Sequence, residues 1–77
     1  MVNNNLLQVQ VGETVRIRSF EGGKSTVSKL RQYGLFIGDV ARVVRYAPFN
    51  GPVLIEVNGR EIALGRGIAV HIIVEVV

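Results

Sequence analysis

Side chains able to bind a metal ion are scattered along this chain. There is one histidine, His71, and the carboxylates are Glu13, Glu21, Asp39, Glu56, Glu61 and Glu75. Metal ligands must converge on one point, and no Asp-x-Asp or Glu-x-x-His spacing occurs. Glu56 and Glu61 flank a predicted turn, so they are expected close or diagonal on paired strands, which leaves open only a weak surface cation site. We therefore predict no dedicated metal site and no cofactor.

The serines lack the partners of a catalytic nucleophile. For Ser19, Ser25 and Ser28, the single histidine lies far along the chain, and no nucleophile-elbow motif is present. The stretch EGGKST contains the Gly-Lys-Ser of a phosphate-binding loop, but position 18, where that motif needs its first glycine, is arginine. The sequence therefore predicts a protein that is not an enzyme and has no small-molecule substrate.

Arginines and aromatic residues on neighbouring segments raise an alternative function, the binding of nucleic acid. In a small barrel such side chains neutralise phosphates and stack on bases. They are Arg16, Arg18, Arg42, Arg45, Tyr46 and Phe49. Arg16 and Arg18 share one strand face, whereas Arg42 and Arg45 fall on opposite faces, so no single basic stripe results. Nucleic acid is therefore the less favoured partner.

Composition limits the class of protein. The 77 residues have room for one domain, 48% of them are hydrophobic, and the net charge is +3. There is no cysteine, which excludes disulfides and Cys-based zinc sites and fits a reducing compartment. No secretory signal is visible, and the longest apolar run, IAVHIIVEVV, is too short to span a bilayer. We expect a cytoplasmic domain.

Alternating apolar and polar residues predict a mainly β protein of about five strands. The expected strands cover 14–19, 39–47, 52–57, 60–64 and 70–76. Asn58-Gly59 supplies the two positive-φ positions of a type I′ hairpin turn. One short helix, from about Thr26 to Tyr33 with Ser25 as its N-cap, is inserted after the first main strand. This order favours a small, partly open SH3-like barrel, with an OB-type barrel as the alternative.

Strand periodicity also predicts which side chains face inward. Val40, Val44 and Tyr46 are expected inward in the strand after the helix. In the last strand the inward residues are expected to be Val70, Ile72, Val74 and Val76. Residues 1–5 are expected to form a mobile tail before a domain of residues 6–77. An open edge, with Ile73 and Val77 near the outer face of the last strand, could pair two copies into a homo-oligomer.

The stretch LRQYGLFIGD, residues 30–39, ends the helix and continues with three large apolar residues. Gly34 is expected at C′ with a positive φ, which brings Leu30 and Leu35 together in a Schellman motif. Leu35 is therefore predicted to be core. Phe36 and Ile37 cannot both follow it inward on so short a link, so at least one is expected at the surface. Gly38 allows the turn into the next strand.

The order of these motifs resembles the FeoA family of small ferrous-iron transport accessory proteins, from about residue 6 to residue 76. The matching residues are Leu30, Gly34, Leu35, Gly38, Ala47, Pro48, Pro52, Gly59, Ile62, Ala63 and Leu64. One departure is Asn50-Gly51-Pro52, where family members often carry Gly-Asp-Pro, so the acidic residue of that loop is missing. The resemblance implies an SH3-like barrel acting beside the membrane Fe²⁺ transporter FeoB, in contact with its cytoplasmic GTP-binding domain at the inner face of the membrane.

The resemblance also implies a second relationship. The same domain occurs at the C-terminus of metal-dependent transcriptional repressors of the diphtheria-toxin-repressor type. Because this chain starts at Met1 without a DNA-binding half, the stand-alone form is expected. With no convergent ligands, its role in iron transport is expected to be indirect, through protein contact. The candidate partner-binding residues are Phe36, Ile37, Arg42, Arg45, Phe49 and Asn50.

Overall fold

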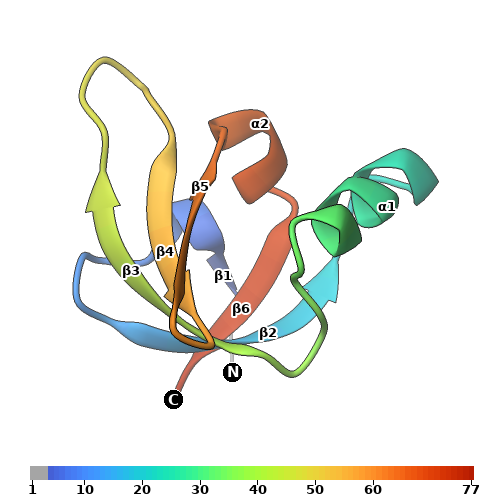
Figure 1. Ribbon diagram of the computed structural model, residues 1–77, viewed down its shortest axis with the longest axis horizontal. Coiled ribbons are helices and arrows are strands. Elements are labelled where there is room, and N and C mark those ends of the chain that lie inside the picture. Colours follow the sequence, from blue (N-terminus) through green and yellow to red (C-terminus); the bar gives the residue numbers. More distant parts are fainter. Residues whose placement is uncertain (1–3) are drawn as a thin grey trace.

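The protein is described by a computed structural model covering residues 4–77 (Figure 1). Its elements in chain order are β1 (Asn4–Asn5), the 3₁₀ helix η1 (Leu6–Gln8), β2 (Thr14–Phe20), α1 (Lys24–Gln32), β3 (Val40–Tyr46), β4 (Val53–Val57), β5 (Arg60–Leu64), α2 (Arg66–Ala69) and β6 (Ile72–Val76). No helix in this part of the chain has the length and apolar character needed to cross a membrane.

The strands form one antiparallel sheet in the order β1-β6-β2-β3-β4-β5. The sheet curls around the interior without closing, and α1 stands at the side opposite to β3 (Figure 1). The prediction of a mainly β, partly open SH3-like barrel with one short helix after the first main strand is confirmed. The short β1 brings the strands to six.

The start of the described chain corrects the expected tail of residues 1–5. Asn4 and Asn5 pair with Val74 and Ile73 of β6. The Asn5 side chain accepts a hydrogen bond from the Leu7 N–H (2.9 Å), and the Asn5 N–H donates to Oε1 of Gln8 (2.9 Å). This reciprocal capping box fixes the entry into η1, so both asparagines belong to the domain. Residues 1–3 lie outside the described residues.

Helix α1 begins earlier than the Ser25 cap predicted. The Val27 N–H donates to the Gly23 carbonyl (3.1 Å), which makes Gly23 the N-cap and places Ser25 inside the helix. No side chain caps this end. The serine is not needed as a cap, because the Gly23 carbonyl already accepts the first backbone hydrogen bond of the helix.

A β-bulge in β3 overturns the expected inward set. Val15 of β2 lies opposite Ala41, and Ala41 and Val43 are buried, whereas Val40 is exposed and Val44 is half-buried. The register with β4 shifts between Val43 and Arg45, and the extra residue turns the following side chains over. Simple alternation would place Val43 and Tyr46, which are three residues apart, on opposite faces. The bulge allows both to pack against the core, so Tyr46 lies inward as expected.

The last strand is shorter and more central than predicted. The helix α2 fills the region after Gly65, so Val70 is an exposed helix C-cap, and Val76 is exposed near the chain end. Strand β6 lies between β1 and β2, and Asn4 and Asn5 of β1 pair with its Val74 and Ile73. Part of the expected open edge is therefore occupied, and the pairing of two copies into a homo-oligomer stays a prediction. The terminal strands of the described sheet are β1 and β5.

The core is entirely apolar. Among residues 4–77 no polar or charged side chain is buried. The buried side chains are Leu6, Val9, Val15, Ile17, Leu30, Leu35, Ala41, Val43, Val53, Ile55, Val57, Ile62, Leu64, Ala69, Ile72 and Val74. Because α1 contributes only Leu30 to this set, the helix depends on the link that follows it for its attachment.

Candidate partner-binding sites

Metal-ligating side chains do not gather in the structure. In the described range, no three His, Cys, Asp or Glu residues come together in a group that could hold a metal ion. Glu56 and Glu61 are directly opposed across β4 and β5, but Arg42 donates to Glu56 (3.1 Å) and neutralises part of this charge. The His71 ring packs against Gly22, since a Cβ added to that glycine would lie only 3.0 Å from the ring. The pair of carboxylates is thus part of a charged sheet face.

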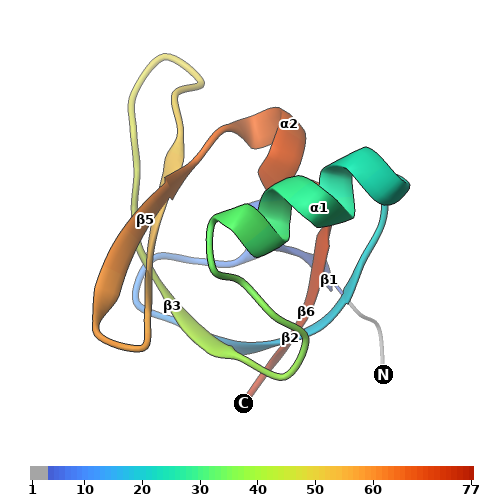
Figure 2. The same ribbon diagram turned by 45° about the vertical axis from the view of Figure 1, so that its right-hand side comes forward.

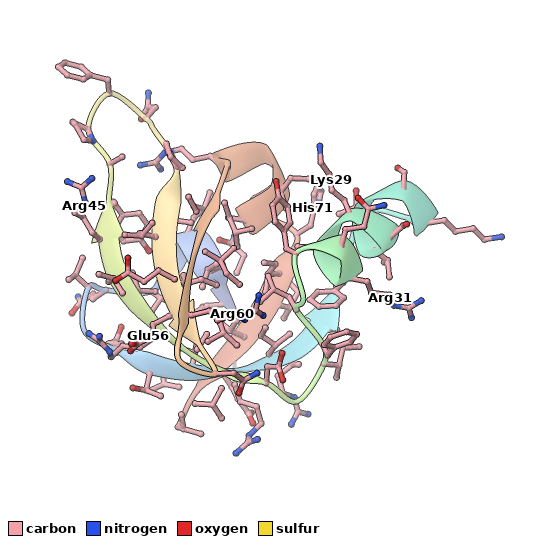
Figure 3. All side chains as sticks on the ribbon, viewed as in Figure 1. Lys29, Arg31, Arg45, Glu56, Arg60 and His71 are labelled. Carbon is pink, nitrogen blue, oxygen red and sulfur yellow. The ribbon has the colours of Figure 1, made fainter. Side chains whose placement is uncertain are left out.

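The strand arginines are largely engaged within the chain. Arg18 pairs with Glu75 (3.2 Å), Arg42 with Glu56, and Arg16 donates to the Gly38 carbonyl (3.0 Å). Arg45 projects outward from β3, on the side of the molecule opposite to Lys29 and Arg31 of α1 (Figure 3). The positive charges therefore form no continuous stripe.

The end of α1 forms the predicted Schellman motif. The Leu35 N–H donates to the Leu30 carbonyl (3.0 Å), and the Gly34 N–H donates to the Arg31 carbonyl (2.9 Å). Gly34 has φ +83°, a conformation that favours glycine. Leu30 and Leu35 are both fully buried, at 0% exposure. This motif fastens the helix to the barrel and delivers the chain to the surface at Phe36.

The first candidate site is the turn formed by residues 36–39. The Asp39 N–H donates to the Phe36 carbonyl (3.1 Å), and the Phe36 N–H donates to the Asp39 carboxylate (3.0 Å). Backbone bonds from Gly38 to Ile17 (2.8 Å) hold the turn against β2. Phe36 is 53% exposed and Ile37 is 64% exposed. Both side chains therefore lie at the surface, where at least one was expected.

The second candidate site is the β3–β4 loop, residues 47–52, which projects beyond the sheet (Figure 1). The Ala47 N–H donates to the Pro52 carbonyl (2.9 Å), and the Gly51 N–H donates to the Pro48 carbonyl (3.1 Å). Phe49 and Asn50 occupy the two central positions of the turn, with φ +59° and +57°. Phe49 is 99% exposed. The loop thus presents one aromatic side chain from a tight turn.

The contacts by which Arg66 and Tyr46 support this loop were not predicted from the sequence. The Arg66 Nε–H donates to the Gly51 carbonyl (3.1 Å), and its guanidinium lies 5.8 Å from the centre of the Tyr46 ring. The Tyr46 hydroxyl is shared between the carbonyls of Leu6 (3.1 Å) and Val9. The bracketing glycines at 65 and 67 were the only local signal for Arg66, because its partner is 15 residues away.

Tyr46 provides a test of these contacts. Burial raises the pKa of its hydroxyl, Arg66 opposes the shift, and Glu13 adds to it. Because the raised pKa favours the protonated form in the folded state, this stabilisation is present below about pH 10 and is lost as pH rises through the folded pKa. Tyr46→Phe should lower the free energy of unfolding by about 1 kcal/mol at neutral pH.

Urea unfolding of wild type and Tyr46→Phe between pH 7 and pH 11 measures this difference. We expect the two stabilities to converge above pH 10. A constant difference across that range would contradict the proposed role of the hydroxyl proton.

The two candidate sites lie at different ends of the molecule. In both views, the β3–β4 loop stands at the top of the left side and the link between α1 and β3 lies at the bottom right (Figures 1 and 2). The structure therefore separates Phe36 and Ile37 from Phe49 and Asn50. Arg45 lies on the strand that leads into the loop, whereas Arg42 is engaged with Glu56.

A small, partly open antiparallel barrel with an apolar core and exposed apolar side chains on two tight turns defines a domain of the SH3-like class. The FeoA domain family matches residues 4–76. The chain belongs to the FeoA family, whose members are iron transport accessory proteins. It is 39% identical, over 64 residues, to a protein of Methanocaldococcus jannaschii provisionally named Fe(2+) transport protein A; the match covers 83% of this chain and 76% of that protein.

Solved structures share the same fold. A crystal structure of an iron uptake regulatory protein, FeoA, has a TM-score of 0.89 and 26% identity, with both chains covered in full. The apo form of the manganese-activated repressor ScaR has a TM-score of 0.87 and 26% identity, and the match covers 96% of this chain but 35% of the repressor. The fold therefore occurs both in FeoA proteins and as part of a longer regulator.

Proposed function

We propose that this protein is a cytoplasmic accessory protein of a ferrous-iron uptake system, without enzymatic activity of its own. It acts by binding the cytoplasmic GTP-binding part of a FeoB-type Fe²⁺ transporter at the inner face of the membrane. The observation that carries the proposal is membership of the FeoA family combined with exposed apolar residues on two ordered turns. Phe36, Ile37 and Phe49 are large apolar side chains that the fold leaves in water.

The arrangement of the charges supports an indirect role in iron transport. The iron itself is cargo, and the described residues offer no group of three or more potential ligands to carry it. A protein partner, in contrast, can cover the exposed aromatic side chains and pair with Arg45, which points outward from the strand leading into the β3–β4 loop. Contact with the transporter therefore explains the exposed apolar side chains and the outward arginine, whereas binding of iron by this chain would explain neither.

The test uses the purified chain and the purified GTP-binding domain of the transporter from the same organism. We expect a saturable complex by isothermal titration calorimetry and a changed rate of GTP hydrolysis when the chain is added. The GTP-binding domain alone supplies the baseline, and a Phe36→Ala, Phe49→Ala double variant should lose the effect. No complex and no change in rate, under reducing conditions with Fe²⁺ present, would refute the proposal.

The likeness to ScaR supports a second candidate, a stand-alone relative of the C-terminal domain of metal-dependent repressors. A separate alternative is a small nucleic-acid-binding barrel, which the arginines of the strands suggested. The pairing of Arg18 and Arg42 with carboxylates argues against direct phosphate binding. A labelled single-stranded oligonucleotide should not bind even at low salt, where phosphate contacts are strongest. Binding that weakens steeply with added salt would favour the nucleic-acid-binding barrel.

A further inference from the structure

The two tight hairpin turns of this protein differ in how well their residues suit the backbone. Asn58 and Gly59 join β4 to β5 with φ +53° and +79°, the pair that this geometry prefers. Phe49 and Asn50 form the corresponding pair in the β3–β4 loop. A positive φ is an outlier for a bulky side chain such as phenylalanine. The β3–β4 loop therefore has an unfavourable residue at a positive-φ position, whereas the neighbouring hairpin has a favourable one.

The exposure of Phe49 makes this exception costly in a second way. The side chain is 99% exposed, so it gains no burial in compensation for its backbone conformation. Asparagine or glycine at this position would satisfy the turn and remove the apolar surface. Departures from local rules of this kind concentrate at functional sites, where the strain holds a group in its working position.

The loop holds the backbone at Phe49 in one conformation. Its two backbone hydrogen bonds close the turn, and Arg66 reaches from α2 to the Gly51 carbonyl. A Cβ on Gly51 would lie 2.9 Å from the Cβ of Ala47, so the two sides of the loop are in close contact. Because the loop backbone is already ordered, little backbone entropy is lost when the aromatic residue binds.

The chain segment that forms the loop and the strand before it carries only positive charge. No acidic residue occurs between Asp39 and Glu56, whereas Arg45 lies at the base of the loop. Arg45 points outward from β3 (Figure 3), and no hydrogen bond or ion pair of its side chain is found within residues 4–77. Charge complementarity therefore favours a partner surface that carries carboxylates.

We propose that Phe49 is the anchor of the docking interface, inserting into an apolar, aromatic-sized pocket with a carboxylate on its rim. The inference rests on the proposed function and assigns this pocket to the GTP-binding domain of the transporter. A protein pocket accounts for the observations better than a lipid surface, because a fluid membrane does not require an anchor on a strained, fixed backbone with a positively charged residue beside it. The turn formed by residues 36–39 lies at the other end of the molecule, so it takes no part in filling this pocket.

The experiment measures the affinity of the full chain for the purified GTP-binding domain. Phe49→Ala should weaken binding at least tenfold, as expected for an aromatic hot spot. Phe36→Ala, a matched change of an exposed phenylalanine at the other end, should weaken it less than threefold. Arg45→Gln should weaken binding severalfold and reduce its dependence on salt. Because Phe36, Arg45 and Phe49 are all exposed, the three variants are expected to remain folded, and circular dichroism checks this.

A second variant separates function from stability. Phe49→Asn places a residue that tolerates the left-handed region at the strained position. We expect its thermal midpoint to rise by a few degrees while its affinity falls as far as that of Phe49→Ala. A rise in stability with unchanged affinity would overturn the proposal.

The remaining outcomes distinguish failure of the docking inference from failure of the proposed function. If wild type binds the domain and Phe49→Ala binds equally well, the docking inference fails while the proposed function stands. If wild type does not bind the domain, both fail. If vesicles of phosphatidylcholine and phosphatidylglycerol sediment with wild type but not with Phe49→Ala, the loop is a lipid anchor and the protein pocket is refuted.

Discussion

Leu35→Ala is expected to lower the free energy of unfolding by about 2–5 kcal/mol, because it leaves a cavity under the end of α1. Leu35 is fully buried and follows the glycine that ends the helix. A domain of this size is stable by roughly 4–12 kcal/mol, so the loss is a large fraction of the total. Urea denaturation followed by circular dichroism measures it.

Ile37→Ala is the matched control for this substitution. The residue lies two positions along the same link and is 64% exposed, so its truncation should change stability by less than about 0.5 kcal/mol. A loss below 1 kcal/mol for Leu35→Ala would contradict the burial of this side chain. If Leu30 and Leu35 form the apolar contact of the Schellman motif, the double variant with Leu30→Ala should deviate from additivity by about 0.5–3 kcal/mol.

Gly34→Ala is expected to cost about 1–2 kcal/mol, because residue 34 has φ +83° and a Cβ is strained there. The added Cβ would also lie 2.6 Å from Nη2 of Arg60. The Arg60 guanidinium donates to the Gly34 carbonyl (3.3 Å), so the substitution displaces a side chain that spans from β5 to the end of α1. Thermal and urea unfolding of the variant check the expected loss.

Gly12→Ala separates these two contributions. Gly12 has φ +90° and no heavy atom within 4 Å of its Cβ position, so this variant reports the backbone strain alone. Gly34→Ala should cost slightly more, since the end of the arginine side chain can move aside. If Gly34→Ala proves neutral while Gly12→Ala is destabilising, the left-handed C′ position of the helix end is contradicted.

The features that the sequence predicted well depend on residues close together in the chain. The Asn58-Gly59 turn and the helix end at Gly34 are determined by the backbone preferences of one or two residues. The burial of Leu35 followed from its spacing to Leu30 within the same motif. Short-range rules were sufficient for these features, because no distant contact competes with them.

Two of the features that the sequence did not predict depend on contacts between distant segments. The bulge at Val44 reverses the faces of β3, and it is visible only in the pairing with β4. The expected open edge of the last strand is partly occupied by Asn4 and Asn5, which come from the other end of the chain. A period-two pattern cannot reveal either one, because it contains no information on which strands are neighbours.

The two candidate sites likewise combine features set by local sequence with features set by contacts between distant segments. By itself, the sequence determined that apolar residues lie on connections, that the helix ends at Gly34, and that the chain resembles the FeoA family. Only the tertiary structure decided that Phe36 and Phe49 lie at opposite ends, and that Arg66 supports the loop from 15 residues away. The physical reason is that turn chemistry is local, whereas the curling of the sheet, which positions the turns relative to one another, arises from the packing of all its strands.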